Sequence, residues 1–315
     1  MRALVVLAAG QRPEVAELPT PAPGAGQVLL RVRAAALNPM DNVLASGGLA
    51  EAMEHRYPLV LGRDVAGVVE AVGDGVTEVS IGDEVIGHIG FAAPFQAGTL
   101  AEFATLAASA VTAKPPSLDY AAAAALPLAG GAALAALEAA GVRSGQTVLI
   151  SGASGGVGRY AVQLAAQRGA TVVATGTAAS AGRLRELGAD TVVDYTAGPV
   201  AEQVRAAYPD GVDVLVNLWA NTVEDVPLAA LRSGGTVSTI TSAPDADTAA
   251  SLGLLGGGIT IASPDRDTIA ALAQDAAVGK LQSDVSRVLP LDEAVEGLDD
   301  LSAGKSHGKV VITLT

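Results

Sequence analysis

From Tyr120 onward, short apolar runs alternate with longer stretches whose apolar residues recur at helical spacing. We predict buried strands at residues 147–151, 171–175, 191–194, 212–217, 235–241 and 258–262. Helical patterns separate most of these runs, and a strand–helix rhythm of this kind is typical of a parallel, doubly wound sheet. The fold class is therefore α/β with a Rossmann sheet, and ligands of such sheets bind at the carboxyl ends of the strands.

The pattern before Tyr120 is different, because apolar and polar residues alternate over short segments with turn residues between them. We predict strands at residues 27–33, 65–72 and 98–103, within a β-rich domain that has few helices. Asn38 is expected to start a short helix with Pro39 in its first turn.

The last fifty residues show a mixed pattern, with helices expected at 266–278 and 291–301 and strands at 286–289 and 309–314. We expect this tail to return and complete the first domain. The predicted organisation is a β-rich domain over 1–119, a Rossmann domain over 120–263 and a C-terminal return over 264–315.

The segment TVLISGASGGVG, residues 147–158, contains the strongest chemical signal. It joins a buried strand to a helix through Ala153-x-Gly155-x-x-Gly158, with alanine at the first glycine position of the dinucleotide fingerprint. Gly155 would let the backbone approach a pyrophosphate, Gly158 would let the helix pack on the strand, and the first helical N–H groups would face the anion. A glycine-rich turn that binds nothing is the alternative.

The second strand of the predicted sheet indicates which dinucleotide binds. An NAD site usually has Asp or Glu at this strand end, whereas this chain has Thr175-Gly176-Thr177. Residues 139–185 contain no acidic residue and five arginines: Arg143, Arg159, Arg168, Arg183 and Arg185. In a chain of net charge −14 this local reversal favours a 2′-phosphate and hence NADPH, although an exposed basic helix face would give the same pattern.

Composition excludes several other classes of function. The acidic balance argues against a nucleic-acid partner, and no apolar run reaches the eighteen residues of a membrane span. The chain has no cysteine and three scattered histidines, so no metal site is predicted. The first residues resemble a strand and not a signal peptide, and we expect a soluble cytoplasmic protein.

Six motifs in order along the chain resemble the zinc-independent quinone oxidoreductase (zeta-crystallin-like) branch of the medium-chain dehydrogenase/reductase superfamily. These motifs lie at residues 36–41, 61–69, 79–85, 151–158, 187–195 and 308–311. The resemblance implies a GroES-like β-rich domain split around a Rossmann domain, a cleft between the two, and a homodimer. Zinc-using relatives have a histidine where this chain has Arg63, together with cysteine ligands, so the resemblance implies chemistry without zinc.

The resemblance also assigns residues to the cofactor. It places Ser154, Gly155, Gly156 and Val157 along the pyrophosphate, Thr175 beside the adenosine ribose, Ser180 and Tyr195 near the 2′-phosphate, and Ile240, Thr241 and Ser242 beside the nicotinamide. Ala179 stands where relatives often have a basic residue, which leaves two alternatives: Arg183 or Arg185 reaches the 2′-phosphate instead, or discrimination of the 2′-phosphate is weak.

The catalytic candidates are Asn38 and Asp41, which match cleft positions of the family. Asn38 is the first candidate to contact nicotinamide or substrate, and helix capping and turn formation are the alternative roles of the two residues. We assign no general acid. The single tryptophan, Trp219, replaces part of a glycine pair that usually follows the fourth strand, and either shapes the pocket or packs structurally.

The leading hypothesis is an NADPH-dependent oxidoreductase that transfers a hydride to a quinone or an α,β-unsaturated carbonyl compound. Two alternatives remain open at this point. One is a dedicated enone or enoyl reductase of a biosynthetic pathway, and the other is a non-catalytic NADPH-binding sensor.

Overall fold

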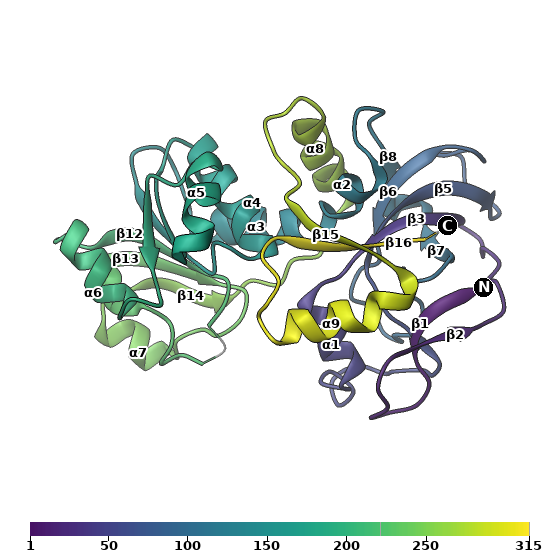
Figure 1. The fold of residues 1–315 in the computed structure, drawn as a ribbon, viewed down its shortest axis with the longest axis horizontal. Coiled ribbons are helices and arrows are strands. Elements are labelled where there is room, and N and C mark those ends of the chain that lie inside the picture. Colours follow the sequence, from purple (N-terminus) through teal and green to yellow (C-terminus); the bar gives the residue numbers. More distant parts are fainter. Residues whose placement is uncertain (221, 315) are drawn as a thin grey trace. The chain divides into compact units, whose positions relative to one another are not determined.

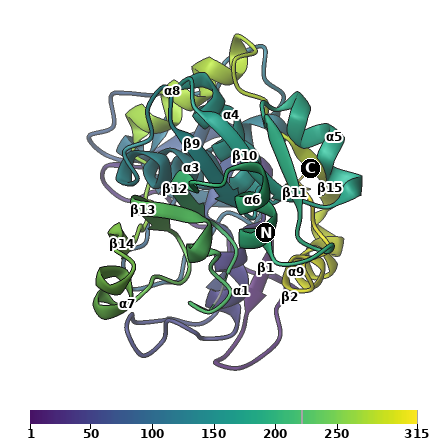
Figure 2. The ribbon, with the colours of Figure 1, turned by 90° about the vertical axis from the view of Figure 1, so that its left-hand side faces the viewer.

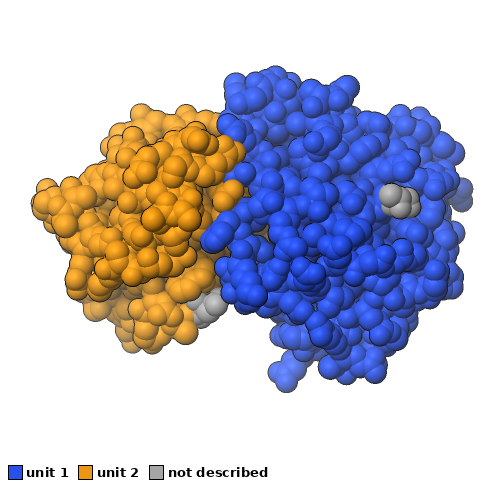
Figure 3. All heavy atoms as spheres, viewed as in Figure 1, with its two compact units in different colours: residues 1–131, 263–315 blue, residues 132–262 orange. Residues whose placement is uncertain are grey.

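The computed structural model describes residues 1–220 and 222–314, which form two compact units (Figure 1). Unit 1 joins residues 1–131 to residues 263–315, and unit 2 comprises residues 132–262 (Figure 3). The first boundary lies twelve residues beyond residue 119, where the sequence analysis placed it, because helix α2 (Tyr120–Ala124) packs on strands of unit 1.

Unit 1 is built around two sheets. The larger one has the order β15-β16-β3-β5-β6-β8, with β7 paired to β3, and the smaller one has the order β2-β1-β4. The strands of unit 1 are β1 (Arg2–Val6), β2 (Glu14–Glu17), β3 (Gln27–Ala36), β4 (Leu59–Val60), β5 (Asp64–Val72), β6 (Glu84–His88), β7 (Phe103–Ala107), β8 (Val111–Ala113), β15 (Val285–Pro290) and β16 (Lys309–Thr313).

The helices of unit 1 lie between its strands along the chain. Besides α2 they are α1 (Pro39–Ala45), α8 (Arg266–Ala277), α9 (Ala294–Ser302) and the 3₁₀ turns η1 (Ala108–Ala110) and η3 (Leu291–Glu293). Helix α3 (Pro127–Ala139) begins in unit 1 and continues into unit 2. Helix α1 starts directly after Asn38 with Pro39 at its first position, as the sequence predicts.

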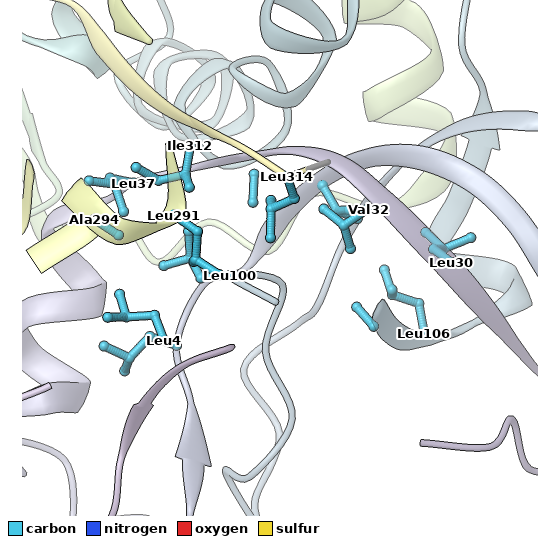
Figure 4. Close-up of a cluster of buried hydrophobic side chains, with 14 of the residues drawn as sticks. Leu4, Leu30, Val32, Leu37, Leu100, Leu106, Leu291, Ala294, Ile312 and Leu314 are labelled. Atoms are coloured by element: carbon cyan, nitrogen blue, oxygen red, sulfur yellow. The ribbon is translucent and has the colours of Figure 1, made fainter. Parts of the chain in front are cut away.

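The C-terminal tail belongs to unit 1 through strand pairing. Strand β16 runs antiparallel to β3, with Val311 opposite Ala36 and Thr313 opposite Ala34, and β15 runs parallel to β16. The tail also supplies part of the main core of the unit. Figure 4 shows Leu291, Ala294, Ile312 and Leu314 from the tail beside Leu4, Leu30, Val32, Leu37, Leu100 and Leu106.

Unit 2 contains a six-stranded parallel sheet in the order β11-β10-β9-β12-β13-β14 (Figure 2). Its strands are β9 (Thr147–Ser151), β10 (Thr171–Gly176), β11 (Thr191–Asp194), β12 (Val212–Asn217), β13 (Leu231–Thr239) and β14 (Leu255–Ile259). In chain order this is 3-2-1-4-5-6, the dinucleotide-binding arrangement, and it confirms the predicted Rossmann sheet.

The remaining helices of unit 2 are α4 (Gly156–Gln167), α5 (Ala178–Glu186), α6 (Val200–Ala207), α7 (Ala246–Ser251) and the 3₁₀ turn η2 (Leu228–Ala230). Helix α4 packs on β9 and β10, and α5 packs on β10 and β11. The core beneath them contains branched residues of the central strands, among them Leu149, Val173 and Leu215.

Three predicted strands have different bounds in the structure. The strand expected at 98–103 is Phe103–Ala107, because the residues before it bond irregularly, with Leu100 accepting from Leu4 and donating to Leu61. Strand β13 runs from Leu231 to Thr239 and not over 235–241, although the N–H of Ile240 still donates to Asn217 O in β12. The last strand of unit 2 is Leu255–Ile259 and not 258–262. Its run of three glycines interrupts the apolar pattern from which a strand is predicted.

Candidate cofactor and active site

The turn after β9 has the geometry of an anion-binding helix start. Gly152 has a positive φ of 80° and accepts the N–H of Gly155 at 3.1 Å, and α4 begins at Gly156. Gly155 is the N-cap and offers no capping side chain, and the first turn of α4 has no acidic residue. The N–H groups of the first helical turn, from Gly156 to Gly158, have no intrahelical partner, so a phosphate oxygen fits here.

The two glycines of the fingerprint differ in whether the protein leaves room for a side chain. A Cβ atom on Gly158 would lie 2.2 Å from Gly152 O and 2.5 Å from Ala153 Cα, so only glycine lets the helix approach the turn. A Cβ atom on Gly155 would meet its nearest neighbour, Gly152 O, at 3.4 Å, which is an ordinary contact. The fold therefore requires Gly158, whereas the space beside Gly155 is open for a ligand.

Thr175 and Ser180 hold the neighbouring backbone at the adenosine end. The buried Thr175 hydroxyl accepts the N–H of Gly152 at 2.9 Å, which fixes the first residue of the glycine turn. The Ser180 hydroxyl accepts the Thr177 N–H at 2.9 Å and donates to Thr177 O at 3.2 Å, which fixes the start of α5. Both residues position the segments around the expected ribose.

Tyr195 directly follows β11, and Arg183 lies in α5, the helix that follows β10. The side chain of Tyr195 is exposed, and its N–H donates to Gly176 O at 3.3 Å, which places it beside the end of β10. The Nη1 of Arg183 is 3.0 Å from Glu186 Oε2. A 2′-phosphate bound by Arg183 would compete with this exposed ion pair, which costs little to break.

Asn217 organises the predicted nicotinamide segment and was not identified from the sequence. Its buried Nδ2 donates to Thr241 Oγ1 at 3.1 Å and approaches Ser242 O at 3.5 Å, and its backbone O accepts the N–H of Ile240 at 3.1 Å. The register places Asn217 opposite both Ser151 and Thr239, so three strands end together. The available signal was an amide at the carboxyl end of a strand that is apolar apart from Asp213.

A dinucleotide fits these carboxyl ends. The main-chain N–H groups of Gly156–Gly158 would hold its phosphates, the ends of β10 and β11 its adenosine half, and the Ile240–Ser242 segment its nicotinamide half. No sequence prediction for these residues is contradicted by the structure.

The catalytic candidates lie in unit 1, in a buried polar cluster. Asn38 is 3% exposed, and its Nδ2 donates to Asp64 Oδ2 at 2.9 Å while its Oδ1 accepts from Lys309 Nζ at 2.6 Å. Lys309 also donates to Leu37 O at 2.9 Å. Asn38 therefore joins the start of α1 to β5 and to the C-terminal strand β16. A role of its amide in substrate contact remains a proposal.

Asp41 performs the capping role that the sequence analysis left open for it. Its Oδ2 accepts the N–H of Asn38 at 2.8 Å, and its Oδ1 accepts the N–H of Gly62 at 2.9 Å. Burial raises the pKa of Asp41 to about 6, and the negative charge of Asp64 adds to this, although the two backbone hydrogen bonds and Arg63 oppose it. Asp41 is thus a fully buried carboxyl group that titrates near neutral pH.

Asp64 is the centre of the cluster. Its Oδ1 lies 2.9 Å from His88 Nδ1 and accepts the N–H of Leu128, in the first turn of α3, at 3.0 Å. A carboxylate at a helix N-terminus is favoured by the helix dipole. The sequence motifs contained Asp64 and Lys309, but nothing in the linear pattern showed that a residue near position 300 returns to the Asn38 side chain.

Arg63 and Lys309 supply the positive charges of the cluster. Burial lowers the pKa of the Lys309 ammonium, while Asp64 and Asp41 raise it, and burial likewise lowers the pKa of Arg63 against the attraction of Asp41. The Arg63 guanidinium carbon lies 4.8 Å from the Phe95 ring centroid, a cation–π contact. Among the described residues, the buried charges therefore interact electrostatically without a direct ion pair to Lys309: Lys309 interacts with Asp64 and Asp41, and Arg63 interacts with Asp41.

Asp41 should make stability depend on pH in an identifiable window. Its folded pKa of about 6 exceeds the ordinary value of 3.8, so the native state binds the proton more tightly than the unfolded state. The resulting stabilisation is present below pH 3.8 and is lost as the pH rises through 6, with a total of about 3 kcal/mol. We expect the difference in unfolding free energy between wild type and Asp41→Asn to shift by this order between pH 4 and pH 7 in urea titrations. A difference independent of pH would contradict the raised pKa.

Two family models match the chain. The alcohol dehydrogenase GroES-like domain matches residues 24–116, and the zinc-binding dehydrogenase model matches residues 187–312. Within residues 1–220 and 222–314, no three His, Cys, Asp or Glu side chains are grouped so that they could hold a metal ion. Nor does any helix of that part of the chain have the length and apolar character needed to cross a membrane.

Curated relatives resemble the chain over nearly its whole length. A mitochondrial NAD(P)H oxidoreductase of Bos taurus is 31% identical, over 91% of this chain and 82% of its own. A quinone oxidoreductase of Sus scrofa is 31% identical, over 96% and 94%. A 2-methylene-furan-3-one reductase of Solanum lycopersicum is 34% identical, over 91% and 71%.

Solved structures of related proteins are also similar to the chain over nearly its whole length. The quinone oxidoreductase of Coxiella burnetii is 29% identical with a TM-score of 0.84, over 100% of this chain and 99% of its own. A mycobacterial protein solved in complex with NADPH is 28% identical with a TM-score of 0.85, over the whole of both chains.

Together, a GroES-like β-rich unit and a Rossmann unit define an NAD(P)H-dependent oxidoreductase. The chain belongs to the quinone oxidoreductase branch of the medium-chain dehydrogenase/reductase superfamily, as the motifs predicted.

Proposed function

We propose that this chain is a zinc-independent reductase that uses NADPH to reduce quinones or α,β-unsaturated carbonyl compounds. The preference for NADPH over NADH is inferred from the end of β10. This strand end has Thr175, Gly176 and Thr177 where an NAD site has a carboxylate, and Tyr195 lies beside it. The similar mycobacterial structure that contains NADPH supports the same preference.

The class of hydride acceptor is inferred from the residues that stand where zinc-using relatives have metal ligands. The chain has no cysteine to ligate zinc, and Arg63, the residue at the histidine position of zinc-using relatives, is buried against Phe95. A substrate that is already electrophilic needs no Lewis acid. The reduced nicotinamide, when bound, supplies the hydride. The protein residues bind and orient: Asn217 holds the nicotinamide segment, and Thr175 holds the glycine turn.

Arg183 provides the sharpest test of cofactor preference. We expect Arg183→Ala to weaken NADPH binding about tenfold and to leave NADH binding unchanged, because only NADPH carries the 2′-phosphate. Fluorescence titration with both nucleotides measures this. Arg185→Ala, two residues further along α5, is the matched variant, and selective loss in that variant alone would move the assignment from Arg183 to Arg185. Equal binding of NADH and NADPH by the wild type would contradict the NADPH preference.

A comparison of acceptors tests the substrate class. At saturating NADPH, the initial rates with 9,10-phenanthrenequinone, a simple enone and a saturated ketone should follow electrophilicity, with the saturated ketone unreactive. Reduction of the ketone at a comparable rate would contradict the proposal, because that reaction needs polarisation of the carbonyl group.

The homodimer and the cytoplasmic location are also proposals. The family resemblance supports the dimer. Light scattering should then give a mass of twice 31.1 kDa.

A further inference from the structure

Trp219 is the most exposed aromatic side chain among the described residues. It is 62% exposed, and the other exposed aromatic residue is Tyr195, at 48%. Each follows the carboxyl end of a strand of the parallel sheet: Tyr195 follows β11, and Trp219 lies two residues beyond β12. Most of the indole is therefore accessible to a ligand, which favours the pocket-shaping role of Trp219 over a structural packing role.

The backbone that carries the indole is held firmly. Leu218 N–H donates to Ser151 O at 3.0 Å, at the end of β9. On the other side, Ala220 N–H donates to Asn217 Oδ1 at 3.2 Å, and Ala220 O accepts from Thr241 Oγ1 at 2.6 Å. An exposed indole on a fixed main chain loses little backbone entropy when a ligand covers it.

Trp219 directly adjoins the phosphate-binding turn. A Cβ atom on Gly152 would lie 2.8 Å from Trp219 Cβ, so the two residues are in close contact at the switch between β9 and β12. In a 3-2-1-4-5-6 sheet the strands β9, β10 and β11 form one mononucleotide-binding half, and β12, β13 and β14 form the other. Since the ribose-contacting position lies at the end of β10, the half that contains Trp219 binds nicotinamide mononucleotide.

We propose that the Trp219 indole is a contact surface for the nicotinamide half of the bound dinucleotide. The inference rests on dinucleotide binding by unit 2, and it adds a residue that the fingerprint does not contain. A large flat aromatic group at this place gains affinity by covering a planar ring or a ribose face, and its N–H can remain in water. The adenosine half, at β10 and β11, does not depend on Trp219.

Isothermal titration with two probes tests this proposal. NADPH contains both halves, and 2′,5′-ADP contains only the adenosine half with its 2′-phosphate. We expect Trp219→Ala to weaken NADPH binding about tenfold, Trp219→Phe to retain most of the affinity, and both variants to bind 2′,5′-ADP as the wild type does. Because the side chain is exposed, neither substitution should alter the melting temperature.

The contradicting outcomes are distinct. If Trp219→Ala binds NADPH as tightly as the wild type, or loses 2′,5′-ADP affinity to the same degree, the proposed contact is wrong while the NADPH assignment stands. If the wild type binds neither probe, the proposed function itself fails.

Discussion

Replacing Lys309 by methionine is expected to lower the free energy of unfolding by about 3–5 kcal/mol. The substitution removes a buried cation that interacts electrostatically with Asp64 and Asp41, and it leaves Asn38 Oδ1 and Leu37 O without their donor. Buried charges that lose their partner cannot recover the cost of desolvation. Chemical denaturation of the purified variant measures the loss.

Lys305→Met is the matched control for this variant. Lys305 lies four residues earlier, is 72% exposed and approaches Asp300 at 3.7 Å. Exposed pairs of this kind contribute at most about 1 kcal/mol, so the control should be nearly as stable as the wild type. If both methionine variants lose the same small amount, Lys309 does not hold the cluster together.

Alanine at either glycine of the fingerprint should weaken nucleotide binding, but only alanine at Gly158 should also lower stability. Gly158→Ala forces a Cβ atom into the main chain of residues 152 and 153, and we expect it to cost about 1–3 kcal/mol of stability or more, together with nucleotide binding. Gly155→Ala fits the protein, since Gly155 has an ordinary φ of −78° and space for a Cβ atom. That variant should keep its melting temperature and lose at least about tenfold in NADPH affinity.

Gly182→Ala is the control for both glycine variants. A Cβ atom on Gly182 would meet nothing within 4 Å, so alanine in α5 should preserve both stability and affinity. Unchanged NADPH affinity in Gly155→Ala would mean that the pyrophosphate does not approach this turn.

Most of the Rossmann unit could be predicted because its signal is local. Strands such as Thr147–Ser151 and Val212–Asn217 are short apolar runs with turn residues around them, and the predicted bounds agree with the structure. The last strands shifted by a few residues where glycine replaces side chains, as in Leu255–Ile259. Hydrophobic periodicity cannot define the ends of a strand at glycines, because glycine has no side chain that is either apolar or polar.

The functional residues also fall into two groups: those that are contiguous in the sequence and those that only the fold brings together. The glycine turn is contiguous, so the start of α4 and the close packing at Gly158 could be predicted from spacing alone, while the role of Gly155 at the pyrophosphate stays a prediction. The cluster of Asn38, Asp64, His88 and Lys309 spans most of the chain, and only tertiary structure brings these side chains together. Asn38 was expected as a contact to ligand, yet its amide already bonds to Asp64 and Lys309.

Zinc-independent, NADPH-dependent quinone reduction is most directly tested by the rate of NADPH oxidation with 1,4-benzoquinone, measured before and after exhaustive dialysis against a metal chelator. We predict rapid turnover that chelation does not change and that falls strongly when NADH replaces NADPH. Tight NADPH binding without oxidation by any acceptor, or loss of activity on chelation, would contradict it.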